Sequence, residues 1–75
     1  MDLDTVTLHL GTYSTRRAYL LADYLVEAEA SFPLSVRIDH RSPVRADVAV
    51  VALREDVTER QLRDACAPAL ARLLP

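Results

Sequence analysis

The segment that most constrains the fold runs from Ala46 to Leu53 and reads ADVAVVAL. It is apolar at both odd and even positions, and it is rich in β-branched valine. A strand covered on one face alternates between apolar and polar residues, whereas a strand covered on both faces or flanked on both edges need not. We therefore predict a central strand at 46–53 and expect the rest of the chain to be arranged around it.

Two shorter segments, 5–10 and 34–39, alternate between apolar and polar residues. This alternation is typical of strands with one buried face, so we predict a strand at each. Gly11 and Thr12 are expected to turn the chain after the first of these strands. The segment 41–45, which contains a proline, is expected to form the turn before the central strand.

Two further segments show the three- and four-residue apolar spacing of amphipathic helices. The first is predicted at 15–30, with Ser14 or Thr15 as its N-cap. The second follows Thr58, which stands three residues before Gln61. This spacing predicts a capping box, in which each side chain bonds the backbone amide of the other residue.

The predicted order of elements is β-α-β-β-α within a single domain, 1–75. A right-handed crossover makes the first two strands parallel and leaves room for a strand between them. The apolar third strand is expected to fill that place, antiparallel to both neighbours. The sequence therefore predicts an α+β two-layer sandwich whose three-stranded sheet has the order 1-3-2, with both helices on one face. This arrangement resembles a ferredoxin-like fold that lacks its last strand.

Composition narrows the class of protein. A chain of 75 residues has room for one modest core, and 51% hydrophobic residues is too many for a disordered chain. The net charge of −2 does not favour nucleic acid as a partner. The apolar runs are too short to cross a membrane. The lone Cys66 excludes an internal disulfide and favours the cytoplasm.

The side chains that most often carry catalysis or bind metals are few in this sequence. His9, His40 and Cys66 fall on separate predicted elements and have no zinc-site spacing. Cys66 lies on the apolar face of the second helix, where a thiol is expected to be inert. We therefore predict a protein that is not an enzyme, with no catalytic residues, no cofactor and no metal.

The predicted topology brings the start of the first helix and the turn 41–45 to one end of the sheet. Helix amides, a hydroxyl group and several guanidinium groups there would suit an anion such as phosphate. The candidate anion-binding residues are Ser14, Arg16, Arg17, Arg41 and Arg45. The alternative is that Ser14 only caps the helix and the arginines form a solvated rim, because 11–17 matches no phosphate-binding loop.

The sheet face away from the helices is a second candidate surface. One alternate set of the central strand must point there, either 48, 50 and 52 or 49, 51 and 53. An apolar stripe inside a polar frame is typical of a contact surface. The candidate interface residues are Thr5, Thr7, His9, Arg37 and Val51. The alternative is that the arginine stem and the threonine methyl groups cover the stripe.

The first predicted strand is an open edge of the sheet, and neither proline nor lysine protects it. Pairing of 5–10 between two copies would satisfy its free amides and extend the sheet across a two-fold axis. A small core would also gain from the additional burial. The sequence therefore favours a homodimer.

Residues 46–53, followed by the Ala- and Leu-rich segment 62–74, resemble small actinobacterial adaptor domains of the effector-associated constant component type. These domains occur in bacterial conflict systems. The segments 19–29 and 34–38 are compatible with the same layout. Where those domains have a glycine-rich turn after the strand, this chain has REDV at 54–57. The resemblance implies a non-catalytic coupling module and assigns no functional residue.

Together, the residues and the resemblance predict a cytoplasmic, non-catalytic interaction or adaptor module of bacterial regulation or defence. Its expected partner is a protein, such as a protease or NTPase effector. Two alternatives stay open. One is an anion or nucleotide-ligand sensor that uses the basic end, and the other is a small phage-type inhibitor of a host enzyme.

Overall fold

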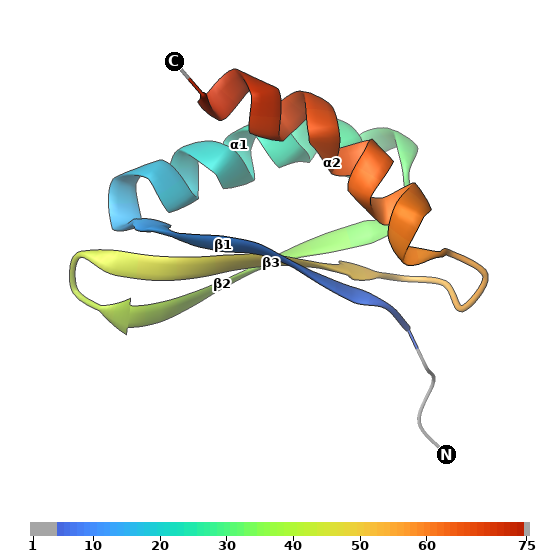
Figure 1. Ribbon diagram of the computed structural model, residues 1–75. Coiled ribbons are helices and arrows are strands. Elements are labelled where there is room, and N and C mark those ends of the chain that lie inside the picture. Colours follow the sequence, from blue (N-terminus) through green and yellow to red (C-terminus); the bar gives the residue numbers. More distant parts are fainter. Residues whose placement is uncertain (1–4, 75) are drawn as a thin grey trace.

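The computed structural model describes residues 5–74, which form one three-stranded sheet and two helices. The elements in chain order are β1 (Thr7–Ser14), α1 (Thr15–Ser31), β2 (Leu34–Ser42), β3 (Arg45–Ala52) and α2 (Glu59–Leu73). The sheet order is β1-β3-β2, and β3 is antiparallel to both neighbours. Both helices cover the same face of the sheet (Figure 1). The predicted α+β sandwich with strand order 1-3-2 is confirmed.

The central strand β3 is buried along its whole helix-facing side. Ala46, Val48, Val50 and Ala52 alternate along it and are almost fully inaccessible to solvent. Ala49 points to the opposite face and is still only 5% exposed, because it is flanked by residues of both outer strands. A strand paired on both edges can therefore be apolar throughout, as the sequence indicated.

Each helix contributes an apolar stripe to the core. In α1 the buried residues are Ala18, Leu21 and Leu25, and in α2 they are Leu62, Cys66, Ala69 and Leu73. Their spacing of three, four or seven residues keeps them on one side of each helix, which is the side that meets the sheet. The core is therefore a single layer between helices and sheet, and it leaves the other sheet face uncovered.

Hydrogen bonds from side chains fix where the helices begin. The Arg17 amide donates to the Ser14 hydroxyl at 3.3 Å, so Ser14 is the N-cap of α1. At α2, the Gln61 amide donates to the Thr58 hydroxyl at 3.1 Å, and the Thr58 amide donates to the Gln61 side chain at 2.9 Å. The predicted capping box is confirmed.

The predicted turn at Gly11 and Thr12 is wrong, because β1 continues through both residues to Ser14. The register shifts between His9 and Gly11, so the strand contains a bulge there. Gly11 has a φ of 121°, which residues with a side chain rarely adopt. The Tyr13 hydroxyl donates to the Leu10 carbonyl at 2.7 Å and so stabilises the bulge. The glycine therefore bends the strand without ending it.

The β2–β3 connection is also tighter than predicted, because only Pro43 and Val44 lie between the two strands. This turn contacts the beginning of α1. The Thr15 amide donates to the Val44 carbonyl at 2.9 Å, and the Thr15 hydroxyl donates to the Pro43 carbonyl at 3.2 Å. The turn and the helix start therefore meet at one end of the sheet, as the topology predicted.

Candidate functional site

The candidate site is the sheet face that the helices leave uncovered, which we call the open face. The pairing register places the side chains of the three strands in rows across it. The open face consists of Thr7, His9, Thr12, Ser35, Arg37, Asp39, Arg41, Asp47, Ala49 and Val51. Its apolar members within the strands, Ala49 and Val51, lie on the central strand with polar side chains on both sides.

The structure brings together most of the predicted interface residues. Thr7 lies opposite Val51, and His9 lies opposite Ala49, which in turn lies opposite Arg37. Thr5 precedes β1 and is half-buried. Of the two alternate sets of central-strand residues considered from the sequence, the set that contains Val51 points to the open face, and the set 48, 50 and 52 points to the helices. The apolar stripe is short, because Val51 is half-buried and Ala49 is almost covered.

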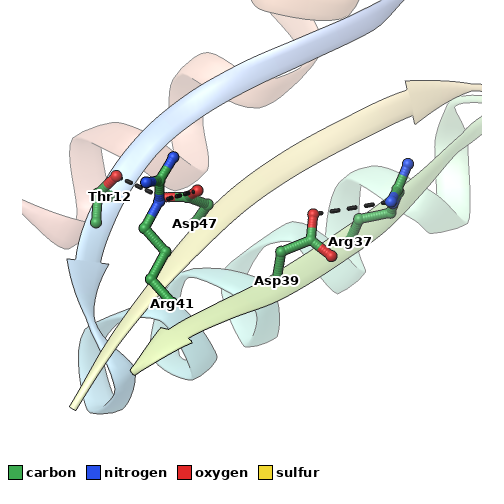
Figure 2. Close-up of polar contacts among 5 residues, drawn as sticks. All are labelled: Thr12, Arg37, Asp39, Arg41 and Asp47. Atoms are coloured by element: carbon green, nitrogen blue, oxygen red, sulfur yellow. Dashed lines mark hydrogen bonds and ion pairs between the residues drawn. The ribbon is translucent and has the colours of Figure 1, made fainter. Parts of the chain in front are cut away.

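A polar network occupies the end of the open face near the β2–β3 turn. Asp47 of β3 accepts hydrogen bonds from the Thr12 hydroxyl of β1 and from Arg41 Nε of β2, the latter at 2.5 Å (Figure 2). These bonds, that from Thr12 above all, lower the pKa of the Asp47 carboxyl below its ordinary value. The carboxylate therefore links all three strands in its ionised form.

This network also offsets a repulsion that is built into the register. Asp39 lies directly opposite Asp47, and like charges in that position destabilise a sheet. Each carboxylate has its own arginine, since Arg41 pairs with Asp47 and Arg37 pairs with Asp39 at 3.7 Å (Figure 2). The two ion pairs thus place charges of both signs on the open face.

A shallow hollow of about 200 Å³ lies beside this network. It is lined by His9, Gly11, Thr12, Arg41, Asp47 and Val48. Sequence reasoning placed Gly11 and Thr12 in a turn and therefore missed the hollow. The one available signal was Asp47, the single charged residue in the apolar run 46–53.

The candidate anion-binding residues lie near one end of the molecule, but their polar groups do not converge. The Ser14 hydroxyl is engaged by the Arg17 amide, and the Arg17 guanidinium donates to the Leu73 carbonyl of α2 at 3.1 Å. Arg41 is held by Asp47 on the open face. The remaining two residues, Arg16 and Arg45, are exposed.

Two amides at the beginning of α1 have partners elsewhere in the chain. The Thr15 amide donates to the Val44 carbonyl, and the Arg17 amide donates to the Ser14 hydroxyl. An anion at a helix N-terminus is held by such amides when they are free. Binding an anion through these two amides would therefore require the chain to give up its own hydrogen bonds.

The structure keeps the three potentially reactive side chains apart. His9 lies on the open face, whereas His40 lies on the helix side, where its Nε2 is 2.9 Å from the Tyr19 hydroxyl. Cys66 is buried in the core, and burial raises the pKa of its thiol. Within residues 5–74, no group of three His, Cys, Asp or Glu side chains is placed to hold a metal ion.

Comparisons of the chain with protein-family models, with curated proteins and with solved structures find no match. Neither of the two described helices is both long and apolar enough to span a membrane. We therefore argue function from the geometry of the open face.

Proposed function

We propose that this chain is a non-catalytic interaction module that binds a partner protein through the open face of its sheet. The observation that carries this proposal is the side of β3 that no helix covers, where Val51 and Ala49 lie within a frame of polar side chains. An apolar centre with a polar rim is the usual anatomy of a protein–protein interface. Both helices pack on the other face, so a partner would meet the open face without displacing them.

The charges of the open face favour a protein over other classes of partner. Arg37 and Arg41 are balanced there by Asp39 and Asp47, whereas a nucleic-acid surface would be predominantly basic. The neighbouring hollow is small, and half of its lining residues have charged or ionisable side chains. Sites for small molecules are usually deeper and mostly apolar. Paired charges around an apolar centre suit a protein surface of complementary charge.

The proposed setting is the bacterial cytoplasm, where the module would couple a regulatory or defence signal to an effector such as a protease or NTPase. The resemblance of 46–53 and 62–74 to conflict-system adaptor domains supports this setting. The single cysteine, which is buried, supports a reducing compartment.

The proposal is tested by photo-crosslinking in a bacterial cell that expresses the chain. A photoreactive residue is placed at Val51 on the open face, and the control carries it at Ala71, an exposed position of α2. We expect a discrete protein adduct from position 51 that is absent from position 71. Adducts that are the same from both positions, or no adduct from position 51, would contradict the proposal.

A second variant separates loss of binding from loss of folding. Val51→Asp places a charge in the centre of the open face, and the residue is already half-exposed to solvent. We expect this variant to keep its helical circular-dichroism signal and to lose the captured partner. If Val51→Asp retains the partner while folded, the open face is not the binding surface.

A further inference from the structure

The outer edge of β2 is a regular row of backbone groups that have no partner within residues 5–74. The Leu53 amide donates to the Pro33 carbonyl at 2.8 Å, so these two residues form a hydrogen-bonded pair. Continuing the register by twos, the backbone groups of Ser35, Arg37 and Asp39 point toward β3. Because the backbone amides and carbonyls of successive residues point to opposite edges of a strand, those of Val36, Ile38 and His40 point away from β3, to the free edge. This edge is uninterrupted in register from Leu34 to His40.

The opposite edge of the sheet is less suited to pairing. In β1 the bulge between His9 and Gly11 shifts the register after a short regular run. A bulge is one of the features by which sheets block their edges, because it bends the strand and twists it away. The structure therefore moves the favoured edge for pairing from β1 to β2.

The open-face side chains of β2 alternate in charge along this edge, in the order Arg37, Asp39, Arg41. If two copies of β2 pair antiparallel with Ile38 on the two-fold axis, Arg37 of each copy lies opposite Asp39 of the other. These are the non-hydrogen-bonded positions, where Cα atoms are about 4.5 Å apart and side chains are closest. Opposite charges in such positions stabilise a sheet.

The two neighbouring registers place like charges together. With Arg37 on the axis, the two copies of Arg37 face each other. With Asp39 on the axis, the two copies of Asp39 face each other, and Arg37 faces Arg41. Like charges directly opposite destabilise the pairing. Among the registers centred on residues 37, 38 and 39, the charges therefore favour the one centred on Ile38. A register centred on His40 would place Asp39 opposite Arg41, but β2 is irregular between His40 and Ser42.

The flank of α1 above the same edge exposes apolar surface. Tyr19 and Val26 are 49% and 56% exposed. They are seven residues apart and so lie on one side of the helix. Contact between the Tyr19 hydroxyl and His40 Nε2 of β2 shows that this side of the helix lies above the β2 edge. A two-fold axis through Ile38 would bring this flank toward its counterpart in the second copy.

We propose that the chain forms a two-fold dimer by antiparallel pairing of β2, with Ile38 on the axis and Arg37 opposite Asp39 of the second copy. The two sheets become one continuous sheet with all helices on one side. Tyr19 and Val26 of the two copies approach each other above the junction. The open face stays uncovered, so this dimer goes beyond the proposed function, and either can fail without the other.

The dimer is tested by analytical ultracentrifugation of the full chain over a range of concentrations. We expect self-association that weakens roughly tenfold when Asp39→Arg or Arg37→Asp makes the facing charges alike. The double variant Arg37→Asp/Asp39→Arg exchanges the two charges and restores opposite charges at both facing pairs of the Ile38-centred register. We expect it to recover the dimer. Thermal melts show whether each variant is folded.

Proline at the other edge provides the matched control. Thr7→Pro removes an outward-facing donor of β1, and we expect the dimer to survive it. A monomer at all concentrations for the unmodified chain would overturn the proposal. Three other results would also overturn it. They are a dimer whose affinity is unchanged by the single charge reversals, a folded double variant that stays monomeric, and a dimer that dissociates when Thr7→Pro is introduced.

Discussion

At the scale of single residues, Asp47 makes the open face sensitive to acid. Its pKa is lowered from 3.8 by hydrogen bonds from Thr12 and Arg41, so the folded state favours the carboxylate. A lowered pKa contributes stability that is present above 3.8 and is lost as pH falls through the folded value. The folded protein should therefore lose stability at acidic pH in part because Asp47 takes up a proton.

We expect Asp47→Asn to lower the free energy of unfolding at neutral pH and to show a smaller further loss below pH 3.8. Urea unfolding at a series of pH values measures both effects. The matched control is Asp23→Asn, which changes an exposed residue of α1 outside this network. If Asp47→Asn keeps the full acid sensitivity of the unmodified chain, the network does not stabilise the fold.

At the scale of elements, the bulge of β1 determines how far the strand extends and which edge can pair. Its backbone needs the positive φ of Gly11, and a Cβ there would also lie 3.4 Å from the Tyr13 hydroxyl. We expect Gly11→Ala to destabilise the protein by about 1–3 kcal/mol, the usual cost of such strain. Ser35→Ala, an exposed change in β2, is the control and should change stability by less than about 0.5 kcal/mol.

Chemical denaturation compares the two variants. If Gly11→Ala were as stable as Ser35→Ala, β1 would not require a positive φ at that residue. The bulge would then be an incidental feature of the strand.

At the scale of the whole molecule, the distribution of arginines bears on the anion-sensor alternative. Arg17 is committed to the Leu73 carbonyl and Arg41 to Asp47, so neither guanidinium is free to join Arg16 and Arg45. In a phosphate titration followed by NMR at low ionic strength, we expect only weak shifts that do not saturate together. A common saturating shift of amides 12–17 and 40–46 would instead favour the sensor.

The sequence by itself determined the order, type and layering of the elements. The run 46–53, apolar at both odd and even positions, indicated a central strand because a strand flanked on both edges need not alternate between apolar and polar residues. The Thr58–Gln61 spacing located the start of α2 because a capping box is a local interaction. Patterns of this kind depend on neighbours within a few residues, so they can be read without the fold.

Only the tertiary structure decided where β1 ends, which face of β3 is open and which side chains meet there. Gly11 is compatible with both a turn and a bulge, and pairing with β3 selects the bulge. Arg41 has one carboxylate on each side of it in the sequence, Asp39 and Asp47, and the strand register gives it Asp47. These outcomes depend on contacts between segments distant along the chain. Register therefore fixed the candidate site, because a shift of one residue would turn every side chain to the other face.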